Sequence, residues 1–181
     1  MQPMAQITTG TWTFDPTHTE IGFTVRHLMS KVRGKFERFE GSITTAPVIT
    51  DSTATATIDL VSINTGTPDR DAHLRSSDFF SVETHPTMTF TSTGVVEKSD
   101  TEFVLRGDLT IKDVTRPVEL AVDFLGEGQD PWGGTRVGIE ATTTISRKDF
   151  GIDFNIPLEG DKVMIGDKIS IIITGEAVLA Q

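Results

Sequence analysis

The sequence predicts an all-β protein, an eight-stranded antiparallel up-and-down barrel with one short helix near residues 67–75. Eight segments alternate apolar and polar side chains with the period of a strand, and short polar turns join most of them. One segment between them lacks this alternation and carries helix signals instead. Eight long antiparallel strands favour closure, because a closed barrel leaves no unpaired edge and eight strands can enclose one ligand.

The expected strands follow a lead-in strand and turn at residues 11–20. They cover residues 21–29, 33–45, 52–61, 87–96, 102–112, 116–126, 136–146 and 168–179. Phe36 and Phe39 fall on opposite faces of the second range, which indicates a bulge there. Ala54 and Ala56 occupy inward positions of the third range, and such small side chains leave space inside a barrel.

Two of the connections carry signals of their own. The segment from Asp113 to Thr115 is short enough for a tight hairpin turn. Residues 126–134 are rich in glycine and also contain Pro131 and Trp132, a composition typical of a surface loop.

The segment from Thr67 to Phe80 predicts the helix. Thr67 suits the N-cap and Pro68 the first helical position, and two aspartates follow in the first turn, near the positive end of the helix dipole. The helix should end near Arg75, because the serines and the aspartate beyond it favour turns. We expect this short helix to act as a lid that delivers a pair of phenylalanines into the mouth of the barrel.

Length and composition limit the architecture and the partners. The chain suits one domain, placed at residues 11–181 after a disordered or loosely ordered tail at residues 1–10. Lys plus Arg is 16 and Asp plus Glu is 26, so the net charge of −10 argues against nucleic acid or an anionic membrane surface as partner. The absence of cysteine excludes disulfides and thiolate nucleophiles. No apolar run has the length of a signal peptide or a membrane span, so we expect a cytoplasmic protein without stable membrane insertion.

Enzyme motifs are incomplete in this sequence. The DFG tripeptide at residues 149–151 matches a kinase metal-binding motif, but no phosphate loop or catalytic loop accompanies it, so a turn after a strand explains it better. The GEG tripeptide at residues 126–128 lacks the third glycine of a dinucleotide-binding fingerprint. No serine lies in a nucleophile elbow. We therefore expect neither catalysis nor a cofactor.

The histidines are scattered along the chain. No two have the spacing that places a pair of imidazoles on one metal within a helix or a strand. Hydrogen-bonding roles are expected for His18 and His85, each of which lies beside a turn. His27 shares a strand face with Phe23 and Val25, and it is either a contact for a ligand head group or a hydrogen-bonded core histidine.

The densest polar cluster is Arg70, Asp71 and His73, in the expected helix. In one interpretation these residues cap the helix, and an Arg–Asp pair fixes the lid. In the other, Arg70 or His73 binds a polar or anionic head group at the rim. Phe79 and Phe80 are core plugs in a filled barrel and cavity wall in a hollow one.

Short segments in matching order carry a family resemblance. They are Trp12, Asp15-Pro16, His18, Phe23, Val25, His27, Gly34, Phe36, Phe39, Gly41, Arg70-Asp71, His73-Leu74, Asp78-Phe79-Phe80, Pro86, Phe90, GDLT at 107–110, VTRPV at 114–118, RKDFG at 147–151, Gly166-Asp167, Ile169 and Glu176-Ala177. From Trp12 to about Ala177 the chain resembles the YceI-like, polyisoprenoid-binding proteins. The resemblance implies an extended, lipocalin-like barrel around a long isoprenoid or related amphiphile, a homodimer, and no established catalysis.

Together these observations lead us to expect non-enzymatic binding, storage or transport of a long isoprenoid-type lipid, such as a quinone or a polyprenyl compound. The expected cavity wall is Phe23, Val25, Leu74, Phe79, Phe80, Met88, Phe90, Leu105 and Phe150. The expected contacts to the ligand head group are His27, His73 and Arg70. Two alternatives stay open. One is an enzyme whose metal is held by His18, His27, His73 and Asp71, and the other is a filled-core barrel that acts as an interaction or stress-response scaffold.

Overall fold

A computed structural model describes residues 7–156 and 164–181, and within them the chain forms an 11-stranded antiparallel sheet. The strands are β1 (Gly10–Phe14), β2 (Glu20–His27), β3 (Ser30–Phe36), β4 (Phe39–Thr45), β5 (Thr53–Asp59), β6 (Ile63–Asn64), β7 (Thr87–Glu97), β8 (Glu102–Ile111), β9 (Val114–Gln129), β10 (Thr135–Ser146) and β11 (Ile165–Leu179). The helices are α1 (Pro68–Arg75) and the 3-10 turns η1 (Pro16–His18), η2 (Ile49–Asp51), η3 (Leu60–Ser62) and η4 (Arg147–Phe150). Within the described ranges, no helix is long and apolar enough to cross a membrane.

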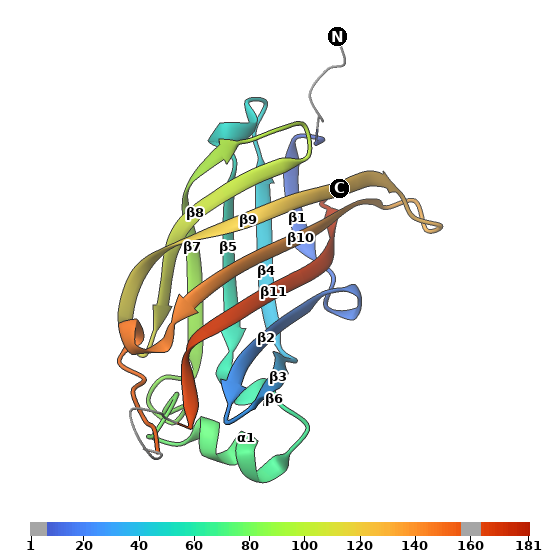
Figure 1. Cartoon of the computed structure of the whole chain (residues 1–181). Coiled ribbons are helices and arrows are strands. Elements are labelled where there is room, and N and C mark those ends of the chain that lie inside the picture. The colour runs from blue at the N-terminus through green and yellow to red at the C-terminus, as the bar shows by residue number, and fades with distance from the viewer. Residues whose placement is uncertain (1–6, 157–163) are drawn as a thin grey trace.

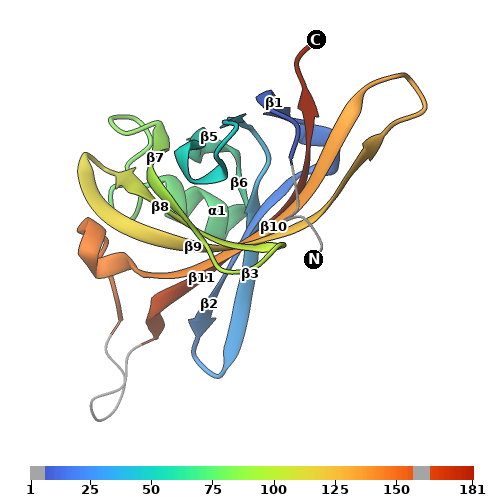
Figure 2. The ribbon, with the colours of Figure 1, turned by 90° about the horizontal axis from the view of Figure 1, so that it is seen from above.

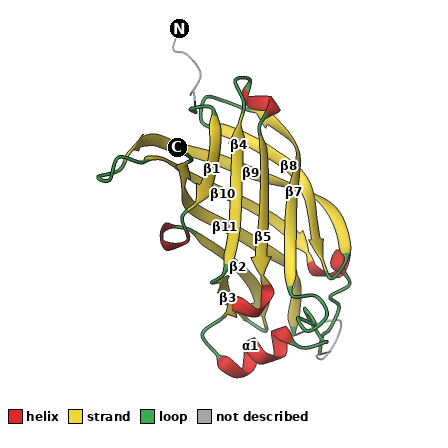
Figure 3. Ribbon diagram, turned by 180° about the vertical axis from the view of Figure 1, so that it is seen from behind, coloured by secondary structure: helices red, strands yellow, loops and turns green. Residues whose placement is uncertain are grey.

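The sheet closes into the predicted eight-stranded barrel. Hydrogen bonds join β1, β4, β5, β7, β8, β9, β10 and β11 in that order, and β1 pairs with β11 to complete the ring, with Trp12 opposite Leu179. Helix α1 covers one end of the barrel, called the helix end below, and the β7–β8 turn marks the opposite, far end (Figures 1 and 3). Inward-facing side chains of the strands form the main hydrophobic cluster inside the barrel.

Two stretches that the sequence predicts less completely are each divided into two strands. They are β1 with β2, and β3 with β4. The expected lead-in strand is β1, a full member of the ring, and η1 separates it from β2, which pairs with β11 nearer the helix end. The expected strand 33–45 is two strands, β3 and β4, and the predicted bulge is a complete break. At this break the amides of Glu37 and Arg38 donate to Ser62, to its carbonyl at 3.2 Å and its hydroxyl at 2.9 Å.

Strand β6 lies beside β3 at the helix end and is joined to it at two positions only, Lys35 with Asn64 and Phe36 with Ile63. Arg75 fastens α1 to the same segment, because its Nε donates to the carbonyl of Val61 at 2.9 Å and its Nη2 to that of Ile63 at 3.1 Å. Helix α1, η3 and β6 are thus bound to one another.

The two connections differ from the expected ones. The turn between β8 and β9 is Lys112–Asp113, with φ angles of 53° and 63°, because Ile111 already pairs with Val114. Two positive φ angles are typical of a type I′ hairpin. The glycine-rich stretch forms strand up to Gln129, and the β9–β10 hairpin extends beyond the barrel wall (Figure 2).

Helix α1 begins and ends at the predicted residues, but its cap differs. Thr67 occupies the N-cap without a side-chain hydrogen bond. Asp71 is buried, and its Oδ1 accepts from the amide and the hydroxyl of Thr65 at 2.9 and 2.6 Å. Arg70 donates to the same Thr65, from Nε to the hydroxyl at 2.8 Å and from Nη2 to the carbonyl at 2.9 Å. Thr65 therefore takes the place of the direct Arg–Asp contact that we expected to fix the lid.

Residues 1–6 of the expected loose tail lie outside the described residues. Thr8 is bound to the barrel, because its amide and hydroxyl donate to the carboxylate of Glu127 at 2.8 and 2.6 Å. The indole of Trp12 and the hydroxyl of Thr45 both donate to the Thr8 carbonyl, at 3.2 and 2.7 Å. Described residues of the expected tail therefore contact the barrel, and the boundary at residue 11 stays a prediction.

Candidate ligand-binding cavity

Two apolar cavities lie in line inside the barrel. The helix-end cavity has a volume of about 400 Å³ and the far-end cavity about 160 Å³. Successive inward-facing residues of one strand line different cavities. On β2, Ile21 lines the far-end cavity and Phe23 the helix-end cavity, and on β7 Phe90 and Met88 divide in the same way.

A packed layer separates the two cavities. Ile58 and Leu109 are buried in the main hydrophobic cluster and line neither cavity. On β8, Leu109 lies between Leu105, which lines the far-end cavity, and Ile111, which lines the helix-end cavity. We call Ile58 and Leu109 the waist. A straight chain that occupied both cavities would have to pass the waist.

The helix-end cavity is mainly aliphatic and aromatic. Its apolar lining is Phe23, Val25, Val32, Phe36, Ile63, Leu74, Phe79, Phe80, Met88, Ile111, Ile145, Phe150, Ile152, Phe154, Ile156, Met164, Ile165, Ile169 and Ile171. Gly34 makes room for one of these rings, because a Cβ at this position would lie 2.4 Å from the Cζ of Phe23. The ring of Phe36 contacts both Phe23 and Phe80, with centroid distances of 5.5 and 6.2 Å.

The polar side chains that border this cavity are mostly basic. Arg70 and His73 come from α1, and His27 lies at the end of β2. The His73 ring lies edge-on to Phe79 and Phe154, with both centroids 5.0 Å away, and its Nε2 is 2.9 Å from Asp78 Oδ2. These contacts fix the imidazole between an apolar wall and an exposed carboxylate.

Arg147 is a buried cation in the wall that the sequence reasoning missed. It is 2% exposed, and burial lowers the pKa of its guanidinium. Its Nε donates to the Gly166 carbonyl at 3.0 Å, and its Nη1 donates to the carbonyls of Ile152 and Phe154 at 3.1 and 2.8 Å. The Asp167 carboxylate is 3.8 Å away. Arg147 thus holds together the segments on which several wall residues lie.

A signal for Arg147 was present in the sequence. The inward positions of β10 are the odd-numbered ones, and Val137, Ile139, Ala141 and Ile145 are all buried. Position 147 continues this series by one step, so the alternation places its side chain inside. Arg147 lies next to the DFG tripeptide, which we interpreted as a turn, so the alternation was not extended to position 147.

The structure places the predicted wall residues in both cavities. Phe23, Val25, Leu74, Phe79, Phe80, Met88 and Phe150 line the helix-end cavity, and Phe90 and Leu105 line the far-end cavity. The three predicted head-group residues, His27, His73 and Arg70, all border the helix-end cavity. Contact of any of these residues with a ligand stays a prediction.

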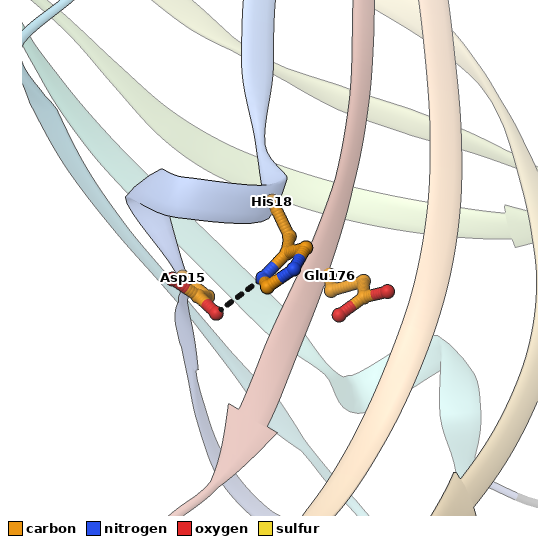
Figure 4. Close-up of side chains that lie close together, drawn as sticks. All are labelled: Asp15, His18 and Glu176. Carbon is orange, nitrogen blue, oxygen red and sulfur yellow. Dashed lines mark hydrogen bonds and ion pairs between the residues drawn. The ribbon is translucent and has the colours of Figure 1, made fainter. Parts of the chain in front are cut away.

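The residues of the metal alternative lie in three different places. His27 and His73 border the helix-end cavity, whereas Asp71 is bound to Thr65. His18 lies instead on η1, near Asp15 and Glu176 (Figure 4). The four residues therefore do not form one metal site.

The cluster around His18 has its own cation. His18 Nδ1 is 2.9 Å from Asp15 Oδ2, and Arg136 Nη1 donates to Asp15 Oδ2 at 2.8 Å and to Glu176 Oε2 at 3.1 Å. The Arg136 hydrogen bond is the main reason why the pKa of the Asp15 carboxyl lies far below its usual range. Arg136 Nε also pairs with Asp130 Oδ2 at 2.8 Å, so the carboxylates that a metal ion would need already share a cation, and we interpret the cluster as an ion-pair network.

Known proteins match this chain along most of its length. The profile of the YceI-like domain matches residues 12–177. A UPF0312 protein of Vibrio cholerae is 40% identical over 137 residues, which are 75% of this chain and 72% of that protein. The YCEI protein of Campylobacter jejuni has 28% identity and a TM-score of 0.73, with 98% of this chain and 100% of that chain covered.

A third similarity concerns the fold alone. A polyisoprenoid binding domain of Saccharophagus degradans, implicated in plant cell wall breakdown, superposes with a TM-score of 0.70 at 16% identity. The superposition covers 96% of this chain and 100% of that chain.

Proposed function

The chain belongs to the YceI-like domain family, and from this membership we propose that it binds a long isoprenoid-type lipid, such as a quinone or a polyprenyl compound, for storage or transport. The observation that carries the proposal is the pair of apolar cavities in line along the barrel, with basic side chains at the helix end. The polyisoprenoid binding domain with the same fold supports this choice of ligand class.

Apolar burial supplies the affinity in this proposal. Each buried methylene contributes about 0.8 kcal/mol. Loss of translational and rotational freedom costs roughly 4 to 15 kcal/mol, so on the order of ten buried carbons offset a cost near the middle of that range. Selectivity along the tail is low, because every methylene is bound in the same way.

Head-group recognition is assigned to α1 and the end of β2. Arg70 uses its Nε and Nη2 to hold Thr65, and its Nη1 has no hydrogen-bond partner among residues 7–156 and 164–181, so we assign the Nη1 donors to a ligand. His73 and His27 add imidazole nitrogens at the same cavity. Donors of this kind suit the carbonyl of a quinone or the oxygens of a prenyl phosphate. The proposed role is non-enzymatic, and the proposed assembly is the homodimer that the family resemblance implies.

Two adjacent residues of β11 provide a matched test. Ile171 lines the helix-end cavity, whereas the side chain of Ile172 is exposed on the outer face of the same strand. We expect Ile171→Trp to fill the cavity and exclude a prenyl ligand, and Ile172→Trp to leave binding unchanged. The measurement is native mass spectrometry of each protein after incubation with a quinone of defined chain length, followed by organic extraction and mass analysis.

The outcomes separate the proposal from its main rival. A near-stoichiometric mass increment in wild type and Ile172→Trp, absent in Ile171→Trp, supports lipid binding in the helix-end cavity. A bare polypeptide mass for all three proteins, before and after incubation with quinones and prenyl phosphates, contradicts it and favours the filled-core scaffold.

A further inference from the structure

The turn between β2 and β3 presents two large apolar side chains to solvent. His27 pairs with Ser30, so Leu28 and Met29 form a two-residue turn. Such turns normally use glycine, asparagine or aspartate, because at least one residue needs a positive φ. Here Leu28 adopts a φ of 55° and is 43% exposed, and Met29 is fully exposed. A positive φ is unfavourable for leucine, and exposure of two large apolar side chains to water is unfavourable as well. The turn is therefore a candidate for a functional contact.

Basic residues cover the outer face of the same hairpin. Arg26, Lys31, Arg33 and Lys35 are exposed, and Arg26 lies directly opposite Lys31 in the strand register. Like charges in directly opposed positions destabilise a sheet. Residues 21–36 contain no acidic residue, although the whole chain has a net charge of −10. The net charge therefore conceals a local concentration of positive charge.

The turn lies at the border of the helix-end cavity. The amide of Leu28 donates to the carbonyl of Met164 at 2.8 Å, and Met164 lines that cavity together with Arg26 and His27. Ile156 also lines the cavity and is exposed. Figure 1 places the turn at the helix end, and Figure 2 shows the β2–β3 hairpin projecting from the barrel.

We propose that the β2–β3 hairpin docks the protein on an anionic lipid bilayer, so that the helix-end cavity opens next to the membrane that holds its ligand. The apolar tip, Leu28 and Met29, enters the interface, and the cations behind it contact anionic head groups. This inference rests on the proposed lipid-binding function. A bilayer fits the tip better than a protein partner does, because two side chains are far smaller than a stable protein interface of about 1,200 to 2,000 Å². The acidic remainder of the chain is repelled by the same surface, so the protein binds in one orientation.

Docking is tested with vesicles that contain no prenyl lipid, so that the cavity plays no part. Wild type should sediment with phosphatidylcholine vesicles that contain phosphatidylglycerol, and not with pure phosphatidylcholine vesicles. Lys31→Gln with Arg33→Gln should weaken this binding roughly 30-fold, since each cation near the surface contributes about fivefold. Leu28→Ser with Met29→Ser should weaken it at least about tenfold, because the tip no longer inserts. All these side chains are exposed, so the thermal unfolding of both variants should match wild type.

A matched variant separates a local site from net charge. Lys98→Gln with Arg106→Gln removes the same number of positive charges from exposed positions outside the hairpin, and it should bind vesicles within about twofold of wild type. An equal loss in the two charge variants overturns the inference, and so does equal binding of wild type to neutral and anionic vesicles.

Calorimetry of short-chain quinone binding in vesicle-free buffer tests lipid binding in the cavity separately from membrane docking by the hairpin. Hairpin variants that bind the quinone normally but no longer dock support the inference. Hairpin variants that bind the quinone and dock like wild type overturn the docking alone. A wild type that docks but takes up no quinone or prenyl phosphate overturns the proposed function, and with it the delivery role of the hairpin.

Discussion

Leu109→Ala tests whether the waist limits the length of chain that the barrel can hold. Leu109 is 7% exposed and lies between the cavities of about 400 and 160 Å³. Truncating a buried leucine lowers the free energy of unfolding by about 2 to 5 kcal/mol, and the loss is greatest when the vacated space stays open. Because Leu109 lies between two existing cavities, we expect the vacated space to stay open and the loss without ligand to be about 3 to 5 kcal/mol.

A long ligand should recover part of this loss, because its tail fills the joined cavity. Each additional buried methylene contributes about 0.8 kcal/mol, roughly fourfold in affinity. Ligand at one hundred times its dissociation constant stabilises the folded state by about 2.7 kcal/mol. The assay is urea unfolding of wild type and Leu109→Ala, each without ligand and with quinones of increasing chain length. The affinity of the variant should continue to rise with chain length beyond the point where that of wild type levels off.

Leu120→Ala is the control for this experiment. Leu120 is also 7% exposed and belongs to the same hydrophobic cluster, but it lines the far-end cavity. We expect a similar loss of stability and no change in chain-length preference. The reasoning is refuted when both variants change the preference equally, or when Leu109→Ala leaves it unchanged.

Three further predictions concern the helix-end cavity and the ion-pair network. Gly34→Ala should weaken ligand binding in calorimetry, because its Cβ would lie 2.4 Å from Phe23 Cζ and push that ring into the cavity. Arg70→Gln should weaken binding of a prenyl phosphate by about 1.5 to 3 kcal/mol more than binding of the prenyl alcohol of equal length, as a competition assay measures. Asp15→Asn should lower the free energy of unfolding at neutral pH, because the Arg136 guanidinium stabilises the charged carboxylate. The folded-state pKa of this carboxyl lies below its ordinary value of 3.8, so its contribution is present above that value and declines as pH falls below it in acid-unfolding curves.

Each of these predictions has an outcome that contradicts it. Gly94→Ala is the control for Gly34→Ala, because no atom lies within 4 Å of a Cβ built at Gly94, and equal effects of the two substitutions would disprove steric displacement. An equal loss of prenyl phosphate and prenyl alcohol in Arg70→Gln would exclude a charge-specific contact. A stability difference between wild type and Asp15→Asn that persists unchanged far below pH 3.8 would show that the ionised carboxylate is not its source.

The sequence predicts the strands well because the two faces of each strand meet different environments. Phe23, Val25 and His27 share one face of β2 by their alternation, and all three line the helix-end cavity, although Arg26 from the other face also borders it. Position along the barrel axis is a different quantity, which depends on the stagger between strands. Phe90 and Leu105 consequently lie in the far-end cavity, although their inward direction was predicted correctly.

Specific side-chain hydrogen bonds account for two features that the sequence did not predict. The break between β3 and β4 is stabilised by Ser62, which lies more than twenty residues further along the chain. The start of α1 is different, because its contacts are local. Thr65, two residues before the N-cap, binds both Arg70 and Asp71 and takes the place of a capping bond from Thr67.

The way the helix end is joined to the ring has a consequence for the rate at which its amide hydrogens exchange with solvent. Two residue pairs join β6 to β3, and β6 belongs to none of the eight strands that close the ring. Leu60 of η3 and Ile63 of β6 are fully buried, whereas Asp71 is the one buried residue of α1. We therefore expect α1 to open locally while η3, β6 and the ring keep their hydrogen bonds. Amide protons of α1 should exchange with deuterium at a rate set by that opening, whereas those of β8 and β9 exchange only on global unfolding. Under the proposed lipid-binding function, local opening of α1 lets a ligand enter and leave the helix-end cavity without unfolding of the barrel.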